Sequence, residues 1–290
     1  MSLSEHQGLI KKGVLTEAEI AEIAQLVALC NEHDGLRTRI PLEALRKRSG
    51  DEIEDFLYYE QGVLVGYLYV DSWGKKEREI TGVVAPDFRR RGIARQLFEA
   101  ACIEYKARGV ECIVVVCEQS SHSGHAFAKA VRAKHDFAEH EMILGNFIER
   151  NQLDPEFQMR PATLDDKEAL VTILATDMGN EEDARQMVEK IYQTSAQQPY
   201  LATLAGKPLG TLRLDEQGET VGIYGFVVHS KYRKRGYGRQ MLEYIIRRIQ
   251  DMGPRTIMLE VETENHNAVG LYTSCGFQIK TTYEYYKHNL

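Results

Sequence analysis

Apolar residues along the chain switch between strand-like and helix-like spacing, and they do so in the same order in both halves. In the second half, helical spacing covers residues 164–176, 181–194, 236–252 and 265–274, and strand-like runs cover 200–204, 209–214, 221–228, 256–261 and the segment from 277 onward. In the first half, helical spacing covers 16–30 and 92–108, and strand-like runs lie near residue 56 and at 63–70, 79–84 and 112–117. The pattern predicts an α/β-mixed fold that occurs twice.

The amino-acid sequence itself also repeats. Arg89, Arg91 and Gly92 return as Arg233, Arg235 and Gly236, each 144 positions later. The same offset holds without a gap from residue 66 to 113, and a period this long is typical of two whole domains. We therefore predict an N-terminal domain at 1–150 and a C-terminal domain at 155–290, joined by the polar segment 145–157.

Composition narrows the class of protein. The 290 residues are 43% hydrophobic and 27% charged, which is typical of a globular chain with about two domains. The net charge of −7 argues against a nucleic-acid partner. Long apolar runs and an apolar N-terminal stretch are lacking in the sequence, so we expect a cytoplasmic protein without a membrane anchor. The five cysteines contain no C-x-x-C pair and are expected to be reduced.

Both halves place a positively charged turn between a strand and a helix that opens with glycine. These turns read Arg-Arg-Arg-Gly-Ile-Ala at 89–94 and Arg-Lys-Arg-Gly-Tyr-Gly at 233–238. A helix start offers free backbone N–H donors and the positive end of the helix dipole, so it suits a phosphate group. The turns match neither the Walker A motif nor the G-x-G-x-x-G fingerprint. A solvated basic helix end is the alternative, but the recurrence favours an anion site.

These turns resemble the acetyl-CoA-binding motif of the GNAT superfamily of N-acetyltransferases, Arg-x-x-Gly-x-(Gly/Ala) after a strand that ends in Val-Val. The second half is similar to that family also at Leu259-Glu260-Val261, Asn265, Leu271-Tyr272 and Gly276-Phe277. The resemblance implies two tandem GNAT-like domains, each a central mixed, mostly antiparallel sheet flanked by helices. It also implies acetyl-CoA as co-substrate, an amine acceptor and no metal. The tandem organisation is similar to that of mycothiol synthases.

The same resemblance implies a set of residues that bind the CoA moiety. In the second half these are Val227, Val228, Arg233, Lys234, Arg235, Gly236, Tyr237, Gly238, Arg239 and Asn265, and in the first half Val84, Arg89, Arg91, Gly92 and Ala94.

Acetyl transfer to an amine needs a base, a donor to the thioester oxygen and an acid. Deprotonating a lysine-like amine at pH 7 costs about 4 kcal/mol, and a nearby carboxylate can take the proton directly or through water. Backbone N–H groups at Val227 and Val228 are candidates for the thioester oxygen. Similarity to the ribosomal-protein N-terminal acetyltransferases implies Tyr272 as the acid and Glu260 as the base. Glu262 or a water chain is the alternative base. In the non-catalytic interpretation, Glu260 is an ordinary surface carboxylate and Tyr272 packs its ring in the core.

The first half lacks these proton-handling groups. The positions 144 residues before Tyr272 and Glu260 hold Ala128 and Val116, and we expect a small insertion that puts residues 135–137 in place of Gly276-Phe277. Glu79 occupies the early-strand position where many GNAT members carry a base, and the second half has Gly222 there.

We therefore predict a degenerate N-terminal domain and a catalytic C-terminal domain that acetylates a primary amine of a small molecule or a peptide N-terminus. The alternative is a CoA-binding sensor or scaffold without turnover. A group of four histidines at 122, 125, 135 and 140 lacks a matching set of further ligands, so no metal is expected.

Overall fold

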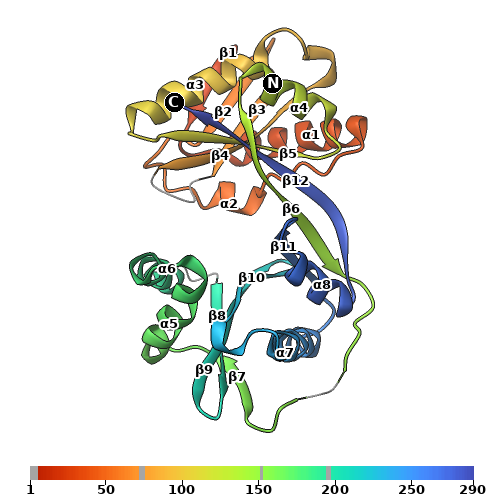
Figure 1. Cartoon of the computed structure of the whole chain (residues 1–290). Coiled ribbons are helices and arrows are strands. Elements are labelled where there is room, and N and C mark those ends of the chain that lie inside the picture. The colour runs from red at the N-terminus through yellow and green to blue at the C-terminus, as the bar shows by residue number, and fades with distance from the viewer. Residues whose placement is uncertain (1–5, 72–75, 151–152, 194–196) are drawn as a thin grey trace. The chain divides into compact units, whose positions relative to one another are not determined.

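The structure is a computed structural model that describes residues 6–71, 76–150, 153–193 and 197–290. The chain forms two compact units (Figure 1). Unit 1 consists of Met1–Ala138 together with Thr281–Leu290, and unit 2 consists of Glu139–Lys280.

Unit 1 contains a sheet with the strand order β1-β2-β3-β4-β5-β12, in which only the β4–β5 pair is parallel. Its strands are β1 (Gly8–Lys12), β2 (Asp55–Glu60), β3 (Val63–Asp71), β4 (Glu77–Val84), β5 (Cys112–Glu118) and part of β12 (Phe277–Asn289). Its helices are α1 (Glu17–Asp34), α2 (Leu42–Arg46), α3 (Ile93–Ala107) and α4 (His122–Ala130). Helix α1 begins in a capping box, in which Thr16 and Glu19 bond each other's backbone N–H, and ends at Gly35.

Unit 2 repeats this arrangement with the strand order β6-β11-β10-β9-β8-β7, in which only the β10–β11 pair is parallel. Its strands are part of β6 (Lys134–Leu144), then β7 (Phe157–Pro161), β8 (Gln197–Leu204), β9 (Lys207–Gln217), β10 (Thr220–Val228) and β11 (Thr256–Glu262). Its helices are α5 (Lys167–Met178), α6 (Glu181–Gln193), α7 (Tyr237–Asp251) and α8 (His266–Ser274). Helices α5 and α6 cover one face of the sheet and α7 the other (Figure 1). The predicted mixed, mostly antiparallel sheet with flanking helices is confirmed.

The two repeats correspond closely from one helix to the next. Shifted by 144 positions, α3 has the bounds of α7, β5 those of β11, and α4 those of α8. The expected insertion after α4 is wrong, because the correspondence continues through the following turn: Arg132, with φ of 59°, stands where the second repeat has Gly276, with φ of 103°. The sequence pattern also missed β1, α2, α4, β6 and β7, which are short or carry polar residues on much of their surface.

The sheets exchange their last strands. Strands β6 and β12 are equivalent in the repeat, yet residues 139–143 of β6 pair with β11 in unit 2, and residues 283–289 of β12 pair with β5 in unit 1. Each sheet is thus completed by a strand from the other sequence repeat. The predicted ranges 1–150 and 155–290 describe the sequence repeats, and they stay a prediction.

Helix α7 is fixed to its sheet by one apolar face. Five residues on that face, at 0% exposure, pack in the core of unit 2: Met241, Leu242, Ile245, Ile246 and Ile249. Burying each such side chain contributes about 1.5–3 kcal/mol. Gly210 on β9 lets the helix approach closely, because a Cβ at this position would lie 2.7 Å from the sulfur of Met241. The start of α7 is therefore held in a defined place. No helix within the described residues is long and apolar enough to cross a membrane.

Candidate active site

The basic turn of unit 2 leads into a helix start that no side chain caps. Helix α7 begins after Gly236, which has φ of 84°, and Lys234 in the same turn has φ of 60°. Arg233 fixes the turn to the end of β10 by donating from Nε to the Val228 carbonyl at 2.9 Å. Its Nη2 also donates to Asp177 on α5 at 3.1 Å. The first N–H groups of α7 are thus presented at a preformed turn, as phosphate binding requires.

The turn of unit 1 has the same backbone shape. Gly92 has φ of 85° and Arg90 has φ of 64°, and Arg89 donates from Nε to the Val84 carbonyl at 2.9 Å. The Arg89 guanidinium also holds Asp34 through two hydrogen bonds of 2.8 and 2.7 Å, which lower the pKa of that carboxyl group. The side chain of Arg89 is 25% exposed against 44% for Arg233, so the unit 1 arginine is more fully committed to its own fold.

Several predicted CoA-binding side chains already have partners within unit 2. The buried Tyr237 donates its hydroxyl to Asp154 at 3.1 Å. Arg239 pairs with Glu243 at 3.2 Å and also hydrogen-bonds Ser274. If these two residues bind CoA, as predicted, they would therefore do so through their backbone N–H groups.

Apart from Val227, which is buried, the other predicted residues lie at exposed or half-buried positions of the same elements. Arg235 is exposed beside the Tyr237 ring, Asn265 accepts from the Ala268 N–H at the start of α8, and Gly238 faces Leu271, from which a Cβ would be 3.3 Å. In unit 1, Arg91 is exposed and Ala94 lies in the first turn of α3.

Strands β10 and β11 separate next to this turn. They pair in parallel from Thr220 and Thr256 as far as Ile223 and Leu259, whereas β10 continues to Val228 and β11 to Glu262. On its other side β10 has a bulge against β9 between Tyr224 and Val227, which contains Gly225 with φ of 55°. A bulge bends its strand, so this opening between β10 and β11 is built into the sheet. Val227 and Val228, the predicted oxyanion donors, lie directly after the bulge.

Glu260 lies on the face of the sheet opposite α7. Leu259 and Val261 are buried in the core beneath α7, so the alternation of strand β11 turns Met258, Glu260 and Glu262 to the other face. The contact of 3.6 Å between the Tyr224 hydroxyl and the Met258 sulfur agrees with this assignment. Glu260 is half-buried and directly opposite Glu141 of β6. Glu262 is on the same face but exposed.

Tyr272 lies on the opposite side of the opening, on α8. It is 6% exposed, and its ring is 6.1 Å from the rings of both Phe226 and Phe277. Burial raises the pKa of the Tyr272 hydroxyl, which keeps it protonated. Glu260 and Tyr272 therefore belong to opposite faces of the sheet around the separation of β10 from β11.

Gly222 has a structural explanation. A Cβ at this position would collide with the ring of Tyr224, which folds back over the glycine. The early-strand position that holds Glu79 in unit 1 is thus covered by an aromatic ring in unit 2.

Unit 1 differs from unit 2 at the bulge and at the positions of the two predicted catalytic residues. Strand β4 pairs with β3 in one continuous register from Val84 to Glu79. Ala128, at the position of Tyr272, is 0% exposed, and Val116 occupies the position of Glu260.

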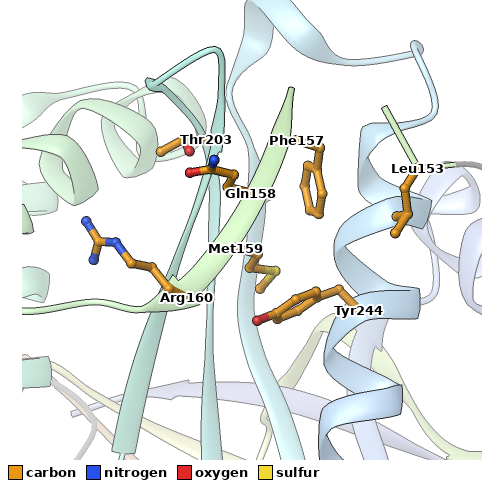
Figure 2. A pocket seen from close by; sticks show the side chains of 7 residues that line it. All are labelled: Leu153, Phe157, Gln158, Met159, Arg160, Thr203 and Tyr244. Carbon is orange, nitrogen blue, oxygen red and sulfur yellow. The ribbon is translucent and has the colours of Figure 1, made fainter. Parts of the chain in front are cut away.

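A cavity of about 420 Å³ lies elsewhere in unit 2, between the edge strand β7 and α7. Figure 2 shows Phe157, Met159 and Tyr244 together on its apolar side. The other residues that line it are Leu153, Gln158, Arg160 and Thr203, so none of the predicted site residues takes part. Among the described residues, no three His, Cys, Asp or Glu side chains are grouped in a way that could hold a metal ion.

Comparison with known proteins agrees with this geometry. The model of the acetyltransferase (GNAT) family matches residues 20–131 and again residues 167–277. The chain belongs to the GNAT acetyltransferase family. A GNAT relative, mycothiol acetyltransferase of Thermomonospora curvata, is 25% identical over 94% of this chain and 95% of its own length. The [ribosomal protein bS18]-alanine N-acetyltransferase of Escherichia coli K12 is 36% identical over 59 residues, 20% of this chain and 40% of that protein.

Solved GNAT structures have the same fold over nearly the whole chain. A GCN5-related N-acetyltransferase from Sphaerobacter thermophilus has a TM-score of 0.78 at 20% identity, covering 97% of this chain and 95% of its own. A tandem GNAT protein from the clavulanic acid biosynthesis pathway has a TM-score of 0.73 at 16% identity, covering 97% and 98%. The tandem GNAT architecture is thereby confirmed.

Proposed function

We propose that this protein transfers an acetyl group from acetyl-CoA to a primary amine, of a small molecule or a peptide N-terminus, and that unit 2 is the site of transfer. The observation that carries the proposal is the opening between β10 and β11, with the uncapped start of α7 beside it and Glu260 and Tyr272 on opposite faces. Unit 1 repeats the turn but lacks the other parts.

The residues of unit 2 fit the CoA moiety of the co-substrate. The turn at 233–238 offers backbone N–H donors and three cationic side chains to a diphosphate. Gly236 and Gly238 keep that approach free of side chains. Main-chain N–H groups near Val227 and Val228 would then donate to the thioester oxygen, where negative charge develops during attack.

The proton transfers follow from the positions of the two side chains. Glu260 accepts a proton from the acceptor ammonium, directly or through water, and the neutral amine nitrogen attacks the thioester carbon. As the C–S bond breaks, its electron pair stays on sulfur, and the thiolate takes a proton from the Tyr272 hydroxyl. The former amine nitrogen loses its second proton as the amide forms, and this proton restores the Tyr272 hydroxyl, so one proton in all is released, through Glu260. The raised pKa of Tyr272 ensures that it holds this proton beforehand. Unit 1, in this proposal, is a degenerate copy without turnover.

A CoA-release assay over polyamines, aminoglycosides, amino acids and short peptides, combined with calorimetric titration of acetyl-CoA, tests the proposal. We expect Glu260→Gln to lower kcat by about 10²-fold near pH 7. The kcat of this variant should recover at high pH, where the acceptor amine is already deprotonated. Glu262→Gln, the matched exposed control on the same strand, should retain most activity. Binding of acetyl-CoA without release for any acceptor would favour the rival function, a CoA-binding sensor or scaffold.

A further inference from the structure

An arginine stands on the proposed acceptor face of unit 2, and no carboxylate of the described residues lies within ion-pair distance of it. Arg213 lies on β9, and its neighbours Leu212 and Leu214 are buried in the core beneath α7. The alternation of the strand therefore turns Arg213 to the opposite face, which is the face of Glu260. Helices α5 and α6 cover this face at Leu201 and Val227, farther along the sheet.

The guanidinium of Arg213 is half-buried and not satisfied by the protein. Its Nε is buried and has no hydrogen-bond partner among the described residues, which also supply no carboxylate within ion-pair distance. Burial lowers the pKa of Arg213, and the nearby Tyr224 and Asp215 offset part of that effect. An arginine nevertheless stays charged, so a desolvated cation is left with open donors.

The guanidinium lies directly beside the bulge at which β10 leaves β11. A Cβ at Gly225 would be 2.6 Å from Nη1 of Arg213, and Gly225 itself is exposed. The Tyr224 ring does not cover this place, because it folds back over Gly222. Gly225 therefore places no side chain between Arg213 and the strand of Glu260, and Tyr224, the β10 residue paired with Arg213, extends toward Gly222 and Met258.

The equivalent position in unit 1 shows a different solution. It holds Tyr69, whose hydroxyl donates to Asp71 at 3.1 Å, so the polar group is satisfied within the strand. In unit 2 the equivalents of Tyr69 and Asp71 are Arg213 and Asp215. Within the described part of the chain these two side chains form no ion pair. The cationic side chain with unused donors is thus found in the unit that also carries Glu260 and Tyr272.

We infer that Arg213 is a specificity-determining residue that binds an oxyanion group, a carboxylate or a phosphate, on the amine acceptor. This inference rests on the proposed function of unit 2. Strands in a sheet are about 4.8 Å apart, so Arg213 and Glu260, two strands from each other, are separated by roughly 10 Å at the backbone. A short acceptor with an amine at one end and an anion at the other matches this arrangement, since Glu260 attracts the ammonium and Arg213 the oxyanion.

Two matched probe pairs test the inference: 3-aminopropionate against 3-aminopropionamide, and 2-aminoethyl phosphate against ethanolamine. Binding to the CoA-saturated full chain is measured by calorimetry, and kcat/KM by CoA release. We expect the anionic member of at least one pair to bind about tenfold tighter, because charge-assisted hydrogen bonds are the strong ones. The pair that shows this preference distinguishes carboxylate from phosphate. Arg213→Gln should abolish the preference and Arg213→Lys should keep part of it.

Lys207→Gln, an exposed cation at the start of the same strand, is the matched control and should leave the preference unchanged. Arg213→Met should keep or raise Tm, because it removes a buried charge without a partner. The inference is overturned by an anionic probe that binds no tighter than its neutral partner, or by an equal loss for both members in Arg213→Gln. Anion preference without CoA release would leave the inference standing and refute acetyl transfer, whereas release with neutral amines and no preference would refute the inference alone.

Discussion

The ring of Tyr272 meets the ring of Phe226 nearly edge-on, at an interplanar angle of 71° and a centroid distance of 6.1 Å. Phe226 belongs to the bulge of β10, so this contact joins α8 to the point where β10 leaves β11. The contact involves the aromatic ring and not the hydroxyl. Ring and hydroxyl of Tyr272 can therefore be tested separately.

Tyr272→Phe removes the proposed acid and keeps the ring. We expect turnover to fall by about 10²–10⁴-fold, the usual contribution of general acid–base catalysis, with the acetyl-CoA Kd within about twofold of wild type. CoA release and calorimetry measure the two quantities. Tyr244→Phe, which removes a hydroxyl beside the cavity in Figure 2, is the control and should be fully active. Wild-type turnover in Tyr272→Phe would assign the acid to another group.

Gly236→Val and Gly92→Val compare the two basic turns. Both glycines have left-handed φ values, 84° and 85°, so valine should strain each turn by about 1–3 kcal/mol and lower Tm similarly. We expect the acetyl-CoA Kd to rise at least tenfold for Gly236→Val and by less than twofold for Gly92→Val. Calorimetric titration of acetyl-CoA into both variants measures the two Kd values. An unchanged Kd for Gly236→Val would contradict CoA binding by unit 2.

Gly225→Ala tests the bulge. Gly225 and Gly218 both have left-handed φ values, 55° and 60°, but only at Gly225 would a Cβ approach another side chain, at 2.6 Å from Arg213. Each alanine should cost about 1 kcal/mol of backbone strain. We expect kcat/KM to fall at least tenfold for Gly225→Ala only, because in the proposed mechanism the bulge positions the donors to the thioester oxygen. Equal activity of the two variants would show that the bulge is dispensable.

Asp166 gives a prediction for stability against pH. Arg160 donates to its carboxylate at 2.7 and 2.9 Å and the Thr163 N–H at 2.8 Å, and these bonds lower the pKa of Asp166, Arg160 contributing most. Because the folded pKa is below the unfolded value of about 3.9, the stabilisation is complete above that pH and is lost as pH falls through the folded pKa.

Asp166→Asn should therefore lower the free energy of unfolding by about 1 kcal/mol at pH 7, a low figure because the side chain of Arg160 is 55% exposed and solvent screens the pair. Urea titrations between pH 7 and pH 2 should show the difference from wild type shrinking below about pH 4. Asp165→Asn removes a neighbouring exposed carboxylate and should change stability by less than about 0.5 kcal/mol. A difference that persists undiminished at pH 2 would contradict this account.

Local sequence was enough to predict the turns and the helices that follow them, because Gly92 and Gly236 act through backbone conformation that neighbouring residues determine. It was not enough to predict which strand completes each sheet, since β6 and β12 are equivalent in the repeat and either could pair with β5. The hydrogen bonds of Arg239 with Glu243 and Ser274 depend on tertiary packing, which the spacing of residues along the sequence does not predict. Arg213 gave no signal in the sequence, because an arginine in a strand looks like a surface residue until its face is known.

The exchange of β6 and β12 bears on how this protein is made. During synthesis, β5 cannot pair with β12 until the ribosome has passed residue 283. The sheet of the first repeat therefore keeps an unpaired edge while the second repeat is being translated. If either repeat were expressed alone, its sheet would have an unpaired edge where the strand of the other repeat is missing. Each repeat therefore depends on the other for a complete sheet, whichever of the two carries out the chemistry.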